Sequence, residues 1–474
     1  MQYQRAKRLL IRDEIHGDMT FDTVLERAID HEYVQRLRGI KQLGLAEYIF
    51  PCATHTRFQH SLGSAYLAGR YFKSFTEQWL SSPVTVAEPC EGTTLHTERT
   101  YRCIRSVVES SSSRKFWYQV ISLAGLLHDV GHGPWSHTFE HLSLEQDFAA
   151  DVAAAPAPLR VYLERREPPF MHEDISVLYM QRILADLEKE GTVPEASLFV
   201  LPVAALVNRK VCAGEYAAPY FVELESVLAK HHIEGGADFQ RLLSPLISGP
   251  FDVDRMDYIQ RDGRNSGVSI GAIEWRRIVS KLVPCLADHQ GDNEPSDVVL
   301  FSSIKNQHVL DDFIFSLFQM YTQVYLHPKI VGLEELIKQQ LDSSTKSRQG
   351  FKVDLKTHAS LSDEKLRELF VKDFGLTGIG DVLTRKAHVK MDIASYPPGA
   401  GLDAELQSNG FRSVSLSDRP MMKDSVGVFL YSRFQPRGED KPAMHHFSNW
   451  LRVSPIARHF VSVNYSPNFW IRSE

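Results

Sequence analysis

Leu126-Leu127-His128-Asp129-Val130-Gly131-His132-Gly133-Pro134 is the stretch of sequence that decides the fold. Residues 117–130 are apolar on most sides, and the glycines and proline that follow predict a buried helix ending in a tight turn. The turn holds an imidazole beside a carboxylate, a pair that can bind a divalent metal. An isolated His-Asp dipeptide more often caps a helix or forms a buried pair, so the metal hypothesis needs partners elsewhere in the chain.

Two further segments supply such partners. Residues 56–63 (TRFQHSLG) place His60 on another predicted helix, near Arg57, whose guanidinium suits phosphate. Residues 251–258 (FDVDRMDY) place carboxylates among apolar residues, where an unpaired buried charge is costly. Together with the His-Asp pair, these segments predict a four-ligand divalent metal site, which suits Fe, Mn, Zn or Mg.

The ordered set of motifs resembles the HD-domain superfamily of metal-dependent phosphohydrolases, whose signature is H…HD…D. It is similar in particular to the deoxynucleoside triphosphate triphosphohydrolases of the SAM-and-HD-domain type, without the SAM domain. The resemblance spans residues 9 to about 330, and its carriers are residues 13–17 (DEIHG), 35–44 (QRLRGIKQLG), 57–63 (RFQHSLG), 128–137 (HDVGHGPWSH) and 252–258 (DVDRMDY). The metal ligands implied by it are His60, His128, Asp129 and Asp254.

The resemblance implies that water attacks the α-phosphorus of a deoxynucleoside triphosphate, giving a deoxynucleoside and inorganic triphosphate. Imidazoles titrate near neutral pH and suit phosphate binding or proton delivery. His132 is the first candidate for this work, with His137 nearby and His172 expected near the phosphates. Glu140 stands where the relatives usually carry Asp, and its expected role is a hydrogen bond to a catalytic histidine.

A deoxynucleotide pocket is also implied, with residues expected to contact the phosphates or the sugar: Gln42, Leu43, Arg57, Tyr258, Asp262 and Tyr325. Gln42 and Leu43 match positions that leave little room for a 2′-hydroxyl. One cation is missing, because Leu317 stands eight residues before Tyr325, where the relatives often place an arginine. Substrate binding at this point must then differ, or another cation such as Lys305 or Arg261 substitutes.

Nucleotide regulation is a weaker expectation. Asp30, Gln35 and Arg38 fit the guanine-reading pattern of the mammalian-type relatives. Leu9 and Arg12, however, stand where a lysine and an asparagine are usual, which argues against nucleotide activation. A homo-oligomer, dimer or tetramer, is expected.

The chain of 474 residues is expected to be mostly α, with an HD-domain helical core and a smaller C-terminal α/β lobe. The predicted domains are 1–345 and 346–474. Residues 81–115 and 149–169, rich in Ser, Pro, Gly or Ala, are predicted to be loops. Apolar periodicity predicts helices within 21–75, 175–187, 217–229 and 311–341. The β-prone runs 389–393, 413–416 and 426–431 lie in the lobe.

Composition indicates the cellular compartment of the protein but does not identify its function. The net charge of −6 shows no basic excess of the kind that indicates nucleic-acid binding. The five cysteines form no CxxC pair, which favours a reducing compartment, and no apolar run reaches the roughly 20 residues of a membrane span. An intracellular protein of cytoplasm or nucleus is expected, with organelle targeting through the basic N-terminus as the minor alternative.

Two other functions stay open at this point. One is an HD-type phosphohydrolase of another nucleotide, a monophosphate or a cyclic nucleotide. The other is a non-catalytic nucleotide or nucleic-acid binding module that keeps the fold, because fold likeness alone does not guarantee chemistry.

Overall fold

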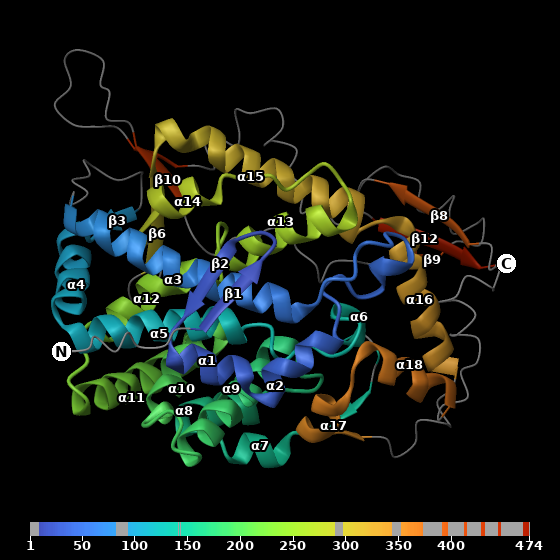
Figure 1. The fold of residues 1–474 in the computed structure, drawn as a ribbon, viewed down its shortest axis with the longest axis horizontal. Helices are drawn as coiled ribbons and strands as arrows, with labels where there is room; N and C mark the ends of the chain where they lie inside the picture. The colour runs from blue at the N-terminus through green and yellow to red at the C-terminus, as the bar shows by residue number, and fades with distance from the viewer. Residues whose placement is uncertain are drawn as a thin grey trace.

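A computed structural model describes residues 9–81, 93–140, 142, 144–289, 297–343 and 352–372, together with five strands beyond them. Those strands are β8 (Met391–Tyr396), β9 (Arg412–Val414), β10 (Val428–Tyr431), β11 (Met444–His446) and β12 (Asn468–Ser473). Helices make up most of the described chain, and the sheets are small (Figure 1). The predicted mostly α fold is therefore confirmed.

Two long helices, α3 (Arg57–Ser81) and α5 (Ser111–Leu127), pack against each other at the centre of the body (Figure 1). Every residue of α5 from 120 to 127 is buried. Ser110 directly precedes the helix, and its hydroxyl accepts a hydrogen bond from the backbone N–H of Ser113 and so caps the first turn. The buried helix expected ahead of the His-Asp pair is thus present, and it starts earlier than predicted.

The two predicted loops are wrong over much of their length. Residues 81–115 contain strand β3 (Thr93–Leu95), helix α4 (Thr97–Glu109) and the start of α5, and residues 82–92 lie outside the described part of the chain. In α4 the buried residues Thr100, Ile104 and Val107 share one face, a helical spacing that the surrounding polar residues hide.

Residues 149–169 likewise contain α7 (Ala149–Ala153) and α8 (Ala157–Glu164). Pro158 lies in the first turn of α8, where proline costs no hydrogen bond, so the prolines here begin a helix rather than exclude one.

The remaining helices surround this core. The predicted helical segments correspond to α1 (Thr23–Asp30), α2 (Glu32–Gln35), α9 (His172–Lys189), α11 (Ala217–Lys230), α15 (Gln307–Met320) and α16 (Pro328–Ser343). Further helices are α10 (Val200–Val207), α12 (Gly236–Ile247), α13 (Val253–Ser266), α14 (Trp275–Lys281), α17 (Leu355–Ser360) and α18 (Asp363–Lys372). A π-helical turn, Tyr321–Tyr325, follows α15. No helix of the described residues combines the length and apolarity needed to cross a bilayer.

The strands form small sheets. The hairpin of β1 (Leu9–Asp13) and β2 (Gly17–Phe21) lies over α3 and was not predicted. A five-stranded sheet runs in the order β11-β10-β6-β5-β3, with β5 (Val283–His289) and β6 (Asp297–Ser303) at its centre. Strand β10 pairs in parallel with β6, so the C-terminal part of the chain adds strands to a sheet of the preceding part. The predicted boundary at 345 and 346 lies outside the described residues.

The turn after α5 is fixed by α9. Ser176 Oγ donates to the carbonyl of His128 at 2.7 Å and accepts from the N–H of Gly131 at 2.8 Å. A Cβ on Gly131 would lie 2.1 Å from the backbone oxygen of His172, so only glycine allows α9 to approach this closely. The N-terminus of α9, with His172, is thereby held beside the His-Asp pair.

Candidate active site

Four side chains from three helical segments converge at the end of α5. The Nε2 atoms of His60 on α3 and His128 lie 3.3 Å apart, and Asp254 Oδ1 on α13 lies 3.0 Å and 3.4 Å from them. Asp129 adds carboxylate oxygens 3.5 Å from His60 Nε2 and 3.4 Å from His128 Nε2. We call these four residues the HD centre. The structure thus brings together all four of the predicted metal ligands.

Both imidazoles of the HD centre are oriented by hydrogen bonds on their other nitrogen. His128 Nδ1 donates to the carbonyl of Gly125 at 2.9 Å, and His60 Nδ1 donates to Asp257 Oδ2 at 2.8 Å. Each Nε2 is therefore the ring nitrogen that faces the carboxylates of Asp129 and Asp254. A partner on the far nitrogen is the usual arrangement around metal-ligating histidines.

Asp257 is the centre of a buried network that sequence reasoning did not predict. Its side chain is fully buried and also accepts from His16 Nε2 at 2.7 Å and from two nitrogens of Arg261 at 2.8 Å each. Arg261 in turn donates to Asp13 at 2.9 Å and 3.2 Å. Residues 13–17, which carried part of the resemblance, therefore support His60, one of the predicted metal ligands, through Asp257.

The electrostatics of the HD centre favour positive charge. Burial opposes protonation of His60, but hydrogen bonds to Asp254 and Asp257 outweigh it and raise the pKa of the imidazole to about 10. The pKa of His128 is also raised, because Asp129 and Asp254 outweigh its burial. Despite burial, the neighbouring imidazoles lower the pKa of the Asp254 carboxyl. The negative electrostatic potential of the carboxylates, which favours protons on these imidazoles, equally attracts a divalent cation.

The donor set fits a metal ion. One donor atom from each residue of the HD centre lies within 4.8 Å of all the others. Ligands about 2.0–2.2 Å from a cation lie about 3–4.4 Å from one another, so small side-chain movements would complete the coordination. Two imidazoles and two carboxylates suit Fe, Mn, Zn or Mg.

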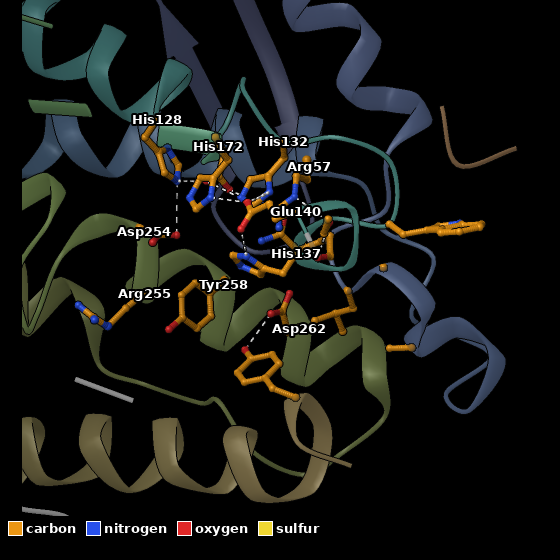
Figure 2. Close-up of a pocket in the computed structure, with 18 of the residues that line it drawn as sticks. Arg57, His128, His132, His137, Glu140, His172, Asp254, Arg255, Tyr258 and Asp262 are labelled. Carbon is orange, nitrogen blue, oxygen red and sulfur yellow. Dashed lines mark hydrogen bonds and ion pairs between the residues drawn. The ribbon is translucent and has the colours of Figure 1, made fainter. Parts of the chain in front are cut away.

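A second group lies next to the HD centre: His132, His137, Glu140 and His172, which we call the imidazole cluster (Figure 2). His172 Nδ1 lies 2.6 Å from Glu140 Oε1, to which it donates. The His132 and His172 rings are stacked with centroids 3.9 Å apart, and His137 meets His132 edge-on at 4.8 Å. All four predicted catalytic residues therefore lie together, with the Glu140 carboxylate facing the three rings.

The two stacked imidazoles differ in charge. Burial, followed by the charges of Arg57 and His172, lowers the pKa of His132 well below its usual value. Burial also opposes protonation of His172, but Glu173 and Glu140 outweigh it and raise its pKa to about 9. These opposite pKa shifts favour the neutral form of His132 and the protonated form of His172 at neutral pH.

Both groups open onto a cavity of about 360 Å³. Its lining includes all six residues predicted to contact the substrate: Gln42, Leu43, Arg57, Tyr258, Asp262 and Tyr325. Asp262 is held in place, because His55 Nε2 donates to its Oδ1 at 2.7 Å and the Tyr325 hydroxyl donates to its Oδ2 at 2.8 Å. Tyr258 and Asp262 are seen below the imidazole cluster in Figure 2.

The cations of the cavity differ from the predicted set. Arg57 lines the cavity but also pairs with Asp129 of the HD centre and donates to Ser136 Oγ at 2.9 Å. Arg261 is fully buried in the Asp257 network, so it cannot replace the arginine whose place Leu317 occupies in the core. Lys305 is not among the lining residues either.

Arg255, which the sequence reasoning passed over, lines the cavity from α13 (Figure 2). It donates to Asp252 Oδ2 at 2.8 Å and to the carbonyl of Gly249. The sequence could have indicated this residue, because Arg255 directly follows Asp254 and both lie in the first turn of α13.

The residues considered for nucleotide regulation lie apart from the cavity lining. Gln35 Oε1 accepts from Arg38 Nε at 2.8 Å, and the Arg38 guanidinium stacks 3.7 Å above the ring of Phe58. Asp30 is exposed at the end of α1. On β1, Arg12 pairs with Asp18 at 2.8 Å on the surface. Regulation through these residues stays a prediction.

Comparisons with known proteins point the same way. The chain is similar to the deoxynucleoside triphosphate triphosphohydrolase SAMHD1 of Bos taurus, with 28% identity over 286 residues, 59% of this chain and 39% of that protein. It is also similar to the SAMHD1 homolog of Dictyostelium discoideum, with 27% identity over 372 residues, 77% of this chain and 55% of that protein. The chain thus spans 39% to 55% of the length of these relatives. No model of a protein family matches it.

Among solved structures, the chain is similar to a phosphohydrolase from Bacteroides thetaiotaomicron, with a TM-score of 0.60 and 21% identity. The match covers 98% of this chain and 99% of that one, so the fold is shared over nearly the whole length. Together with the sequence relatives, this confirms the resemblance to HD-domain phosphohydrolases of the deoxynucleoside triphosphate triphosphohydrolase type.

Proposed function

We propose that the protein is a metal-dependent phosphohydrolase that cleaves deoxynucleoside triphosphates into deoxynucleoside and inorganic triphosphate. The single observation that carries the proposal is the HD centre, with its imidazoles held by Gly125 and Asp257, opening onto the same cavity as the imidazole cluster. A divalent cation held by His60, His128, Asp129 and Asp254 would polarise a phosphoryl oxygen and make a water molecule easier to deprotonate.

The protein itself must position the phosphates and supply a proton. Arg57 and Arg255 line the cavity as cations, and Arg255, although it already donates to Asp252 and Gly249, is the candidate for the phosphate contact that Leu317 cannot make. His172 is the better proton donor to the departing 5′-oxygen, because it is the protonated member of the stacked pair. His132, the first candidate from sequence, is neutral and instead suits accepting a hydrogen bond. Glu140 keeps the imidazolium of His172 in place.

The sugar end of the cavity favours a deoxyribose. Asp262 is fixed by two hydrogen bonds and offers carboxylate oxygens to a 3′-hydroxyl. Leu43 and Tyr325 line the cavity with apolar surface, which gives a 2′-hydroxyl no partner and would leave it desolvated. This arrangement supports selection of the deoxynucleotide over the ribonucleotide.

The test is incubation of the purified chain with each deoxynucleoside and ribonucleoside triphosphate under Fe²⁺, Mn²⁺, Zn²⁺ or Mg²⁺, with both products identified. We expect inorganic triphosphate and a deoxynucleoside, and slower cleavage of ribonucleotides. Asp254→Asn should lower the rate at least ~100-fold, since metal assistance is worth several kcal/mol. Asp186→Asn, which changes a partly exposed carboxylate away from the cavity lining, is the matched control.

Release of orthophosphate, or cleavage of only monophosphates or cyclic nucleotides, would instead identify an HD phosphohydrolase of another nucleotide. Absence of any turnover with every metal would favour a binding module. The predicted homo-oligomer is a separate proposal, and the molecular mass in solution tests it.

A further inference from the structure

The imidazole cluster has the composition and spacing of a metal site in its own right. The Nδ1 atoms of His172, His132 and His137 lie 2.6 Å, 3.6 Å and 3.6 Å from the nearer carboxylate oxygen of Glu140. One donor atom from each of the four residues lies within 4.8 Å of the others. Three imidazole nitrogens and one carboxylate oxygen are a complete ligand set for a tetrahedral ion.

A second, independent observation is the buried nitrogen of His132. Only 1% of this residue is exposed, yet its Nδ1 makes no hydrogen bond within the described part of the chain. A buried polar atom without a partner costs about 1–3 kcal/mol and calls for an explanation. The nitrogen faces Glu140 at 3.6 Å, just beyond hydrogen-bonding distance, so a ligand between the two would satisfy both.

The other nitrogen of His132 has the support that ligating imidazoles receive. Its Nε2 lies 3.4 Å from Asp129 Oδ1, an arrangement of carboxylate and imidazole that fixes the ring and strengthens its far nitrogen as a ligand. Access is available as well, since the cluster lines the cavity and the His137 side chain is 50% exposed.

The ligand set selects the class of cation. Four ligands about 2.0–2.1 Å from a tetrahedral ion lie about 3.3–3.4 Å from one another. This is close to the 3.6 Å that separates the Glu140 carboxylate from the Nδ1 atoms of His132 and His137. The short contact between His172 and Glu140 is a hydrogen bond, whose proton must leave when a metal binds. Imidazole donors suit Zn²⁺ and its transition-metal neighbours, whereas Mg²⁺ prefers oxygen ligands and retains water.

We propose that the imidazole cluster is a second cation site, which takes a zinc-class divalent ion, and that its occupation inhibits phosphohydrolysis. Binding at this site follows from the geometry alone. The inhibition rests on the proposed function, because the bound ion would take the nitrogens that otherwise meet the triphosphate and would displace the proton of His172.

The decisive experiment measures Zn²⁺ binding to the full chain after metal removal with a chelator. We expect wild type to bind two ions tightly. Asp254→Asn should keep the cluster ion alone, and Glu140→Gln should keep the ion of the HD centre alone. Glu140→Gln should raise the dissociation constant of the lost ion at least ~10-fold, since even indirect support of a ligand is worth 10–100-fold.

His308→Gln, an exposed histidine on α15, is the matched control and should bind both ions as wild type does. His137→Gln is a second test, because His137 is half exposed and its replacement is less disruptive to folding than that of the buried Glu140. This variant should also lose the ion of the imidazole cluster. If both variants bind Zn²⁺ with wild-type stoichiometry and affinity, the cluster is not a cation site and the proposal is overturned.

Activity separates the two parts of the proposal. With Mn²⁺ present, added Zn²⁺ should inhibit wild type in competition with the deoxynucleotide, and His137→Gln should need at least ~10-fold more Zn²⁺ relative to its own uninhibited rate. Full activity of wild type with the cluster ion bound would overturn the inhibitory role. If no variant or wild type turned over any nucleotide, the proposed function would fail, while the binding stoichiometry would still decide the site.

Discussion

Replacement of Asp257 by asparagine should weaken metal binding without removing any of the proposed metal ligands. The carboxylate accepts from His60 Nδ1 at 2.8 Å, from His16 at 2.7 Å and from two nitrogens of the fully buried Arg261. Asparagine keeps the shape but loses the charge and one acceptor. Loss of such support costs 10–100-fold in metal affinity, or about 1.4–2.8 kcal/mol at ~1.4 kcal/mol per tenfold change.

The same change should lower the free energy of unfolding. Breaking a buried ion pair costs about 3–5 kcal/mol, and we expect the lower end because Asp13 continues to pair with Arg261. Affinity is measured on the metal-free chain by competition with a chromophoric chelator, and stability by denaturant unfolding followed by circular dichroism.

The matched control for this prediction is Asp238→Asn. Asp238 accepts two hydrogen bonds from Arg99 at 2.7 Å and 2.8 Å, but the arginine is half exposed. This surface pair should be worth about 0.2–1 kcal/mol of stability and nothing in metal affinity. A folded Asp257→Asn chain whose metal affinity stayed within twofold of wild type would refute the idea that Asp257 orients His60.

Three further predictions concern the same cavity. The rate should fall as pH rises through about 9, because the pKa of His172 is raised to about 9 and the proposed proton donor is the imidazolium that exists below this pKa. In Glu140→Gln, a pH-rate profile should show a lower midpoint, because the carboxylate that stabilises the imidazolium is lost. An unchanged midpoint would contradict the role given to the hydrogen bond between His172 and Glu140. Tyr325→Phe should lower kcat/KM for deoxynucleotides ~10–100-fold, the value of a hydrogen bond to a charged group, whereas a purely packing role predicts no loss. Gly63→Ala should lower the free energy of unfolding by about 1–3 kcal/mol in a denaturant titration, because the added Cβ would lie 1.8 Å from Asp257 Oδ1. An increase in the free energy of unfolding of ~1 kcal/mol, as expected for Gly→Ala at an exposed helix position, would contradict this.

The helical body and the residues of the site were predictable because their signals are local or ordered along the chain. The apolar run before His128 predicted the buried α5, and the motif order predicted which residues meet at its end. The helices within residues 97–109 and 149–164 were missed because their apolar faces are short. Serine and proline there mark helix starts, as at Ser110, although composition alone suggested loops.

The supporting contacts of the site could not be predicted, because they join residues far apart in sequence. His16 meets Asp257 across 241 positions, and His55 meets Asp262 across 207. These contacts depend on the β1–β2 hairpin lying over α3 and on the register of α13, neither of which the local pattern of apolar residues specifies. The charge difference between His132 and His172 likewise follows from burial and neighbours rather than from residue type.

The account is tested most directly by hydrolysis of a deoxynucleoside triphosphate in ¹⁸O-labelled water. Attack at the α-phosphorus breaks the bond between that phosphorus and the 5′-oxygen. We therefore predict that the label enters intact inorganic triphosphate, at one terminal phosphoryl group, and that the deoxynucleoside is unlabelled. Label in the deoxynucleoside, or release of labelled orthophosphate or pyrophosphate in place of triphosphate, would contradict it.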